Sequence, residues 1–427
     1  MDSESLEFAT EPVPPEHRVG WIRVGVISAM VAFSLPTFVT GAEVFLAIDN
    51  ANGMAAVLVG CALITLIGSV AGLIGTRTHL SSYMLARIAF GTNGAAIVNI
   101  AFAISLLGWF GVNIDLFGGA LLRLLEDTLG LSVHPWVIEL FAGALMTVTT
   151  IYGFRAINAL STLLVPVMMV VTVVLISSAL GSRPFAETLG AQQVAEITFG
   201  YAVSSVIGGI IVGAVILPDI TRFIRKRRGA IYTAVLAYLV VQPVVMVAGG
   251  LAADLLANDD FLDVLIVMGL SWAAFVIVIA GSWVLNSLNL YSTTLSIEAT
   301  FPKSENRLLI IILGALGTVA AFFNILDYFL AFLFYLAIVF VPVAGVIAVD
   351  HFLARPSAYF ENLHSAERSL SPMALVAWAA GSIVALLGAE EVIRLTGVAA
   401  VDAMLVSAAG YALLSRFDTS LPRSRAA

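Results

Sequence analysis

An apolar run at residues 106–115 holds an indole and an amide four residues apart, Trp109 and Asn113. If the run is helical, Asn113 lies one turn after Trp109 on the same face. An indole offers stacking area and an amide offers in-plane hydrogen bonds, a combination that suits a flat polar heterocycle. Tryptophan in a membrane is usually an interfacial anchor, but Trp109 falls near the middle of its run. The pair therefore predicts a binding site for a small ring.

Two carboxylates, Glu43 and Asp115, also lie within apolar runs. An ionised acid at the centre of a bilayer costs about 2.5–3.5 kcal/mol, so it usually faces a cavity, pairs with another group or binds a proton. Either residue is a candidate for carrying a coupling proton. The alternative is a solvated or hydrogen-bonded group near the membrane edge.

A polar stripe follows residues 282–296 at spacings of four, three, four and three, in the order Ser282, Asn286, Asn289, Thr293 and Ser296. These spacings place the side chains on one face of a helix. Such a stripe either lines a passage or hydrogen-bonds to neighbouring helices, because polar residues also hold membrane helices together.

The composition requires a membrane environment for the elements that carry these residues. Of the 427 residues, 60% are hydrophobic and 11% are charged, whereas about 25% are charged in a typical soluble domain. A soluble protein of this size could not cover its surface with so few charges, while a lipid bilayer requires none. The sequence therefore predicts an all-α polytopic membrane protein whose surroundings are the lipid bilayer.

Charge and motif content exclude several function classes. A net charge of −8 argues against a nucleic-acid partner, which favours basic surfaces. The single cysteine, Cys61, excludes an internal disulfide and a cysteine-rich metal site. The five histidines fall in tails, loops or span ends, and no HExxH, GxSxG or Walker A motif occurs. The main signatures of metal hydrolases and ATP-driven proteins are therefore missing, and we expect no cofactor and no enzymatic activity.

Apolar segments of about 20 residues, long enough to cross a bilayer, recur along the chain. About twelve can be delimited, at approximately 22–48, 52–76, 95–124, 135–154, 157–180, 198–220, 230–256, 264–297, 306–325, 327–350, 373–389 and 397–415. The connections are too short for a soluble domain, so we expect a single transmembrane domain over 21–416. Residues 1–20, acidic and proline-containing, predict a disordered cytoplasmic tail, and 417–427 a second cytoplasmic tail.

The distribution of basic residues predicts the orientation of these segments. With twelve segments, 17 of the 20 Lys and Arg residues fall on the side of the N-terminus, and only Arg123, Arg183 and Arg394 fall on the other. Cytoplasmic loops of membrane proteins carry such an excess. We therefore expect both termini in the cytoplasm and the domain in the cytoplasmic (inner) membrane.

Two segments contain helix-breaking residues at corresponding positions. The first holds Ser34-Leu35-Pro36-Thr37 followed by Gly41, and the sixth holds Ser204-Ser205 and then Gly208-Gly209, with Gly213 and Pro218 further on. Paired interruptions five segments apart are typical of inverted-repeat transporters, in which the substrate binds where the helices unwind. The alternative is that Gly and Pro are simply frequent in membrane helices.

Several motifs occur in order along most of the chain: Phe38-Val39-Thr40-Gly41, Gly75-Thr76-Arg77-Thr78-His79-Leu80, Leu85-Ala86-Arg87 with Phe90-Gly91, Gly108-Trp109-Phe110-Gly111-Val112, Pro218-Asp219 with Arg222-Phe223, Asn286, and Asn289-Leu290-Tyr291-Ser292. Together they resemble the cytosine permease branch of the nucleobase–cation symporter family. The resemblance implies twelve helices, with two extra C-terminal helices after a five-plus-five inverted repeat. On this basis repeat one is about 21–180, repeat two about 198–350 and the extra helices about 373–416.

The resemblance also implies roles for individual positions. Trp109 matches the aromatic residue that stacks on the base, and Met30 and Phe33 match positions whose backbone carbonyls help to hold sodium. Ile210 and Val212 correspond to a stacking aromatic and a serine of the sixth helix. Leu106 stands where the family often has a base-binding glutamine. Val284 and Leu285 replace the two hydroxyl residues that bind sodium, and their side chains offer no oxygen ligand.

The expected function is a secondary transporter that imports cytosine or a related nucleobase-like heterocycle by alternating access, coupled to a proton or sodium. A hydantoin or a thiamine precursor is the alternative substrate, and a membrane-embedded enzyme or a channel is the alternative class of protein. The ion-coupling candidates are Asp115, Glu43, Met30 and Phe33. The expected substrate contacts are Trp109, Asn113, Ser34, Gly208, Gly209, Ile210, Val212, Asn286 and Asn289.

Overall fold

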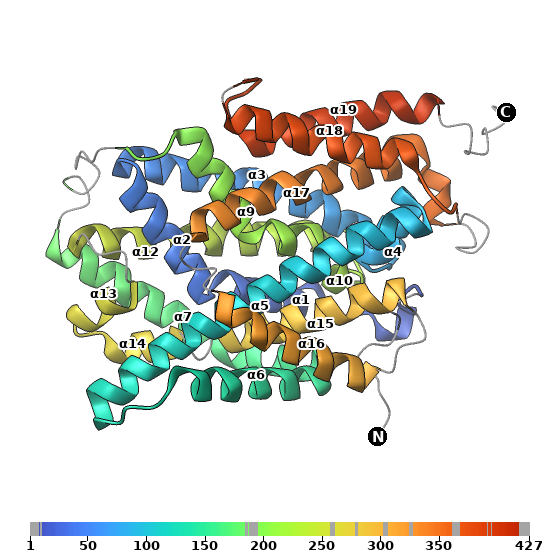
Figure 1. Ribbon diagram of the computed structural model, residues 1–427. Helices are drawn as coiled ribbons and strands as arrows, with labels where there is room; N and C mark the ends of the chain where they lie inside the picture. Colours follow the sequence, from blue (N-terminus) through green and yellow to red (C-terminus); the bar gives the residue numbers. More distant parts are fainter. Residues whose placement is uncertain are drawn as a thin grey trace.

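A computed structural model describes most of the chain: residues 8, 11–183, 187, 195–256, 261–277, 281–301, 306–323, 328–360, 368–390, 392–393 and 395–417. Within these ranges the regular structure is helical, and one isolated bridge joins Val19 to Ile224. The long helices run roughly side by side across the molecule (Figure 1). The predicted all-α architecture is confirmed.

The helices follow the predicted segments closely. Their bounds are α1 Trp21–Ala32, α2 Leu35–Ala47, α3 Asn50–Thr78, α4 Ser82–Phe90, α5 Thr92–Leu129, α6 Pro135–Ile151, α7 Gly153–Ser182, α9 Phe199–Val215, α10 Pro218–Thr221, α11 Arg228–Ala234, α12 Gln242–Leu256, α13 Phe261–Val267, α14 Ser271–Val276, α15 Ser282–Thr300, α16 Asn306–Ala320, α17 Phe329–Val349, α18 Pro372–Ala389 and α19 Ala399–Leu414. A π-helical stretch, Val235–Val241, joins α11 to α12. The short helix α4 lies in a connection where we predicted no element.

Among the described residues, eight helices are long and apolar enough to cross a membrane. The bent pair α1–α2 makes a ninth candidate, and α6 and α16 are shorter apolar helices. The predicted count of twelve spans stays a prediction.

The predicted segment 264–297 is not one helix. A turn at Gly269 separates α13 from the helices α14 and α15 that follow, residues 278–280 lie outside the described residues, and the polar stripe lies on α15. Gly269 follows α13 with a φ of 73°, a left-handed conformation that favours glycine and ends helices. Figure 1 shows α13 and α14 at one end of the helix bundle.

The predicted break in the first segment is confirmed. Helix α1 ends at Ala32, α2 begins at Leu35, and the two are bent by 48°. Ser34 is extended between them, and Pro36 occupies the first turn of α2, where a missing N–H costs no helical hydrogen bond. The break therefore follows from the local sequence.

The predicted break at Gly208-Gly209 is wrong, because α9 runs without interruption from Phe199 to Val215. The chain turns instead at Ile216 and Leu217, before Pro218 begins α10. A Cβ on Gly208 would lie 1.7 Å from the backbone oxygen of Leu333 in α17. Gly208 thus lets two helices approach closely, a common use of small residues in membrane bundles.

The N-terminal strap, residues 11–20, is ordered against the domain. Val13 is fully buried and its N–H donates to the His79 carbonyl at 3.0 Å, just after α3. The Val19 N–H donates to the Phe223 carbonyl at 2.7 Å, just after α10. The expectation of a disordered tail therefore does not hold for residues 11–20; residues 1–7, 9 and 10 and the tail from 418 lie outside the described residues.

The extra C-terminal helices are tied to the rest of the bundle through Asp350. Its carboxylate accepts from Arg355 at 2.8 and 3.0 Å, from Tyr359 at 2.8 Å and from Tyr411 of α19 at 2.6 Å. Arg355 also donates to the Ile88 carbonyl in α4. This buried network fixes α17, α19 and α4 relative to one another.

Candidate substrate-binding site

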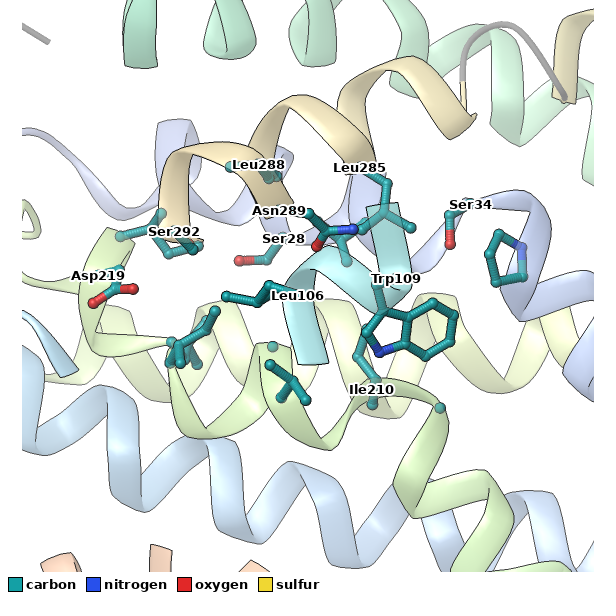
Figure 2. Close-up of a pocket in the computed structure, with 18 of the residues that line it drawn as sticks. Ser28, Ser34, Leu106, Trp109, Ile210, Asp219, Leu285, Leu288, Asn289 and Ser292 are labelled. Carbon is teal, nitrogen blue, oxygen red and sulfur yellow. The ribbon is translucent and has the colours of Figure 1, made fainter. Parts of the chain in front are cut away.

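A cavity lies where the α1–α2 break meets α5, α9, α10 and α15 (Figure 2). The empty space inside the cavity and in the solvent at its open mouth together amounts to about 730 Å³. Its lining is mainly apolar with several hydroxyls, one amide and one carboxylate: Ser28, Val31, Ser34, Pro36, Leu106, Trp109, Gly209, Ile210, Val212, Gly213, Ile216, Leu217, Asp219, Ile220, Tyr238, Leu285, Leu288, Asn289 and Ser292. An apolar pocket with a few converging polar groups is typical of a small-molecule site.

Trp109 of α5 lies in the wall of this cavity and is 5% exposed. Its ring meets Phe329 and Phe332 edge-on, at centroid distances of 6.2 and 5.3 Å. Edge-to-face contacts of this kind restrict the orientation of an indole. Figure 2 shows the indole near Ile210 at the end of the cavity that also holds Ser34. The indole is thus held between two phenylalanine rings and the cavity.

Asn289 of α15 is the amide that lines the cavity. Its Nδ2 donates to the Asn286 side-chain oxygen at 3.3 Å, which leaves its own carbonyl oxygen as an acceptor for another group. Asn286 donates through Nδ2 to the Phe110 carbonyl at 2.9 Å and to the Met146 sulfur at 3.2 Å. Asn286 is fully buried and absent from the cavity lining. Its position supports Asn289 rather than a direct contact.

Six of the nine predicted contact residues line the cavity: Ser34, Trp109, Gly209, Ile210, Val212 and Asn289. Asn286 and two others do not. Asn113 is fully buried and its Nδ2 donates to the Trp109 carbonyl at 2.7 Å, one turn back along α5. Gly208 faces the α17 backbone. Trp109 and Asn113 therefore lie one turn apart on one helix, as predicted, but the Asn113 amide bonds to that helix and does not line the cavity.

Two cavity hydroxyls near the break, those of Ser34 and Ser28, are placed differently. Ser34 lies 3.1 Å from Thr37, oxygen to oxygen, across the first turn of α2. Ser28 of α1 lines the cavity, and its hydroxyl forms no hydrogen bond with any residue that the structure describes. We did not predict Ser28 as a cavity residue. Its signal was a hydroxyl residue one and a half turns before the break.

Met30 and Phe33, the predicted sodium-holding positions, are buried at the end of α1 and do not line the cavity. The α1–α2 break packs against Gly281, where α15 starts: a Cβ there would lie 3.2 Å from the Phe33 carbonyl oxygen. Val284 is fully buried and Leu285 lines the cavity. Within the described part of the chain, no group of three or more His, Cys, Asp or Glu side chains could hold a metal ion.

The predicted coupling carboxylates Glu43 and Asp115 are half-buried, in α2 and α5, and both interact with other groups. Neither lines the cavity. The carboxylate that does line it is Asp219 of α10, which is 1% exposed. We did not predict Asp219 as a site residue; in the sequence it stands out only as an acid directly after Pro218, at the end of an apolar segment.

Comparisons with known proteins agree with this architecture. The chain is 28% identical over 414 residues to the cytosine permease of Escherichia coli strain K12, covering 97% of this chain and 95% of the relative. It is 23% identical over 390 residues to the hydantoin permease of Microbacterium maritypicum, covering 83% and 79%. These relatives are transporters and not enzymes.

Among solved structures, the chain is similar to Mhp1, a nucleobase-cation-symport-1 family transporter, in a closed conformation with bromovinylhydantoin bound. The TM-score is 0.82 at 20% identity, over 98% of this chain and 95% of that one. The match confirms the predicted inverted-repeat transporter fold, and with the apolar helices it identifies a multi-pass membrane protein. The model of the family "permease for cytosine/purines, uracil, thiamine, allantoin" matches residues 12–413, so the chain belongs to this family of permeases.

Proposed function

We propose that this permease imports a nucleobase-like heterocycle, cytosine or a close relative, by alternating access around the cavity at the α1–α2 break. The observation that carries the proposal is the convergence of the Trp109 indole and the Asn289 amide on one cavity. A flat ring stacked on the indole would present its polar edge to the amide. Ser28 and Ser34 would supply further hydrogen-bonding groups.

The rest of the lining supports a ring with little polar surface. Leu106, Ile210 and Val212 offer no hydrogen bonds, so a polar edge directed at them would be left unpaired. The similarity to both a cytosine permease and a hydantoin permease supports the same substrate class. Hydantoins and thiamine precursors are the alternative substrates within it.

We further propose that transport is coupled to a cation, and that a proton suits this chain better than sodium. Sodium prefers several oxygen ligands, and Val284 and Leu285 supply none from their side chains. Glu43 and Asp115 are the proton carriers that the sequence predicts, although neither lines the cavity, while Met30 and Phe33 would contribute to a sodium site only through their carbonyls.

The basic residues support a location in the cytoplasmic membrane with both termini in the cytoplasm. The cluster at 222–228 and the N-terminal strap meet through the bond from the Arg225 N–H to the Val19 carbonyl, at 3.0 Å. They therefore lie on the same side of the protein, the cytoplasmic side under the positive-inside rule.

The test is to purify the protein and screen pyrimidines, purines, hydantoins and thiamine precursors for a rise in unfolding temperature, because a ligand that binds only the folded state stabilises it. The strongest binder is then used, radiolabelled, for counterflow in proteoliposomes. Saturable exchange against unlabelled substrate supports a carrier. Flux without saturation would favour a channel, and the absence of stabilisation by every ring tested would overturn the substrate class.

A further inference from the structure

We propose that the Asp219 carboxyl group binds the coupling proton. This inference rests on the proposed function, in which a cation moves with the substrate. Asp219 lies at the opposite end of the cavity from Trp109 and Ser34, next to Ser292 (Figure 2). The proton site and the substrate site would therefore share one cavity.

The surroundings of Asp219 leave one of its oxygens available. Oδ1 accepts from the Ser82 N–H at 2.8 Å, whereas no donor among the described residues meets hydrogen-bond geometry at Oδ2, and the Tyr83 hydroxyl interacts with the carboxylate. Asp219 is 1% exposed. A buried carboxylate with an incompletely bonded oxygen is costly when ionised and is relieved by taking up a proton.

Arg222 interacts electrostatically with Asp219, but its hydrogen bonds go to other groups. Arg222 donates from Nε to the main-chain oxygen of Asp219 at 3.0 Å and from Nη1 to the Phe8 carbonyl at 2.6 Å, rather than to the carboxylate. Arg222 is fully buried. Its guanidinium therefore holds backbone in place and leaves the carboxylate without a directly bonded cation among the described residues.

The other ionisable groups around Asp219 are phenols and one imidazole. Tyr83 of α4 and Tyr291 of α15 interact with it electrostatically, and Tyr238 lines the same cavity. From α3, His79 reaches this region by its bond to the Arg222 carbonyl at 2.7 Å. Groups that donate hydrogen bonds suit a carboxyl that exchanges a proton better than they suit a metal ion, which needs oxygen ligands with free lone pairs.

Asp219 also lies at a contact between the two proposed repeats. Asp219 follows the turn after α9, in repeat two, while Ser82 begins α4, in repeat one. Their hydrogen bond thus joins the halves at one end of the cavity. Because alternating access moves one half against the other, a change in the charge of Asp219 would change the energy of that contact. Protonation and movement would be linked at this bond.

The experiment uses full-length protein in proteoliposomes with the best ligand from the screen. Wild type should accumulate substrate when a pH gradient, acidic outside, is imposed, and added substrate should acidify the lumen, as reported by a trapped pH dye. Asp219→Asn should still exchange labelled for unlabelled substrate but should lose both accumulation above the external concentration and lumen acidification.

The matched control is Asp49→Asn, the same carboxylate-to-amide change outside the cavity. Asp49 caps α3 by accepting from the Asn52 N–H at 3.1 Å, a role that asparagine also fills. This variant should behave as wild type in all three measurements. Asp115→Asn and Glu43→Gln are run in parallel, because loss of accumulation in either, with Asp219→Asn normal, would transfer the role and overturn the inference.

The failures of the two proposals are distinguishable. If wild type itself shows no saturable exchange, the transport proposal fails. If wild type exchanges and Asp219→Asn still accumulates substrate on a pH gradient, or if only a sodium gradient drives wild type, the proton role of Asp219 fails alone. Should Asp219→Asn not fold, Asp219→Glu keeps a carboxyl group and must shift the pH dependence of accumulation; an unchanged pH dependence would also overturn the inference.

Discussion

Asn289 and Asn286, three residues apart on α15, are joined by a 3.3 Å hydrogen bond between their side chains, with Asn289 as the donor. Because Asn286 also donates to the Phe110 carbonyl, the bond orients the cavity amide relative to the helix that carries Trp109. The distance between the stacking surface and the amide is thereby set by a chain of contacts from α15 to α5.

Replacing Trp109 tests the stacking role. Trp109→Ala should weaken substrate binding by about 1–3 kcal/mol, roughly 5- to 150-fold in Kd, the range measured for stacking of a base on an aromatic side chain. Binding is measured by ligand-induced stabilisation and by saturable exchange. Trp136→Ala serves as the control, because Trp136 is 51% exposed on α6. Unchanged affinity in Trp109→Ala would contradict the role.

Replacing Asn289 and replacing Asn286 should have different effects on substrate binding and on stability. Asn289→Ala should weaken substrate binding with little change in the unfolding temperature of the empty protein. Asn286→Ala should lower that temperature as well, because it removes the hydrogen bonds of a fully buried amide to the Phe110 carbonyl and the Met146 sulfur, at a cost of about 0.5–1.5 kcal/mol each. Thermal unfolding with and without ligand measures both quantities. Equal destabilisation of the empty protein by the two changes would argue against a supporting role for Asn286.

Replacing external sodium tests whether uptake is independent of sodium, as expected if Val284 and Leu285 supply no sodium ligand. Uptake by proteoliposomes should be unchanged when external sodium is exchanged for choline at constant pH, since neither side chain offers a ligand for a hard cation. Membrane potential is clamped in both conditions so that only the ion identity differs. Strict dependence on sodium would show that its ligands come from other residues.

The glycine contact between α9 and α17 can be tested directly. Gly208→Ala should destabilise the protein by about 1–3 kcal/mol or more, because the added Cβ overlaps the Leu333 backbone and the helices must separate. Gly119→Ala is the control: nothing lies within 4 Å of its Cβ, so helix propensity alone should favour alanine by about 0.5–1 kcal/mol. Similar unfolding temperatures for the two variants would refute the packing role.

The N-terminal strap should make stability depend on pH through His79, which lies outside the spans. Burial lowers the pKa of His79 below its usual value, the bond to the Arg222 carbonyl opposes this, and the charges of Arg18 and Arg227 lower it further. The unfolded chain therefore binds the proton first, at a pKa of about 6.5. The stabilisation from neutral His79 is complete above that pH and is lost as the pH falls toward the folded-state pKa.

The measurement compares wild type with His79→Asn between about pH 7.5 and 5.5, the window in which free histidine titrates. Asparagine tolerates the left-handed φ of 58° at this position better than most residues. Wild type should lose more of its unfolding temperature across this window than the variant. Parallel losses in both proteins would exclude His79 as the titrating group.

Much of this protein could be predicted from local sequence alone. Apolar length and scarce charge specify membrane helices, since lipid leaves few other ways to satisfy the backbone. The first break was predictable because Pro36 acts on its own helix. Trp109 was predictable as a cavity residue because membrane tryptophans usually lie at the interface, whereas this one falls near the middle of an apolar segment.

Other features depend on neighbours that are remote in the chain. Glycine both interrupts helices and permits close packing, so only the Leu333 backbone distinguishes these uses at Gly208. From the sequence, the Asn113 amide could face a cavity or bond to its own helix. In the structure it donates to the Trp109 carbonyl of its own helix and does not line the cavity. Asp219 reaches the cavity because a turn after α9 places α10 against α4, a contact between residues 137 positions apart that no local pattern encodes. Local sequence determines where helices form, whereas the packing of helices against one another determines which polar groups share a cavity.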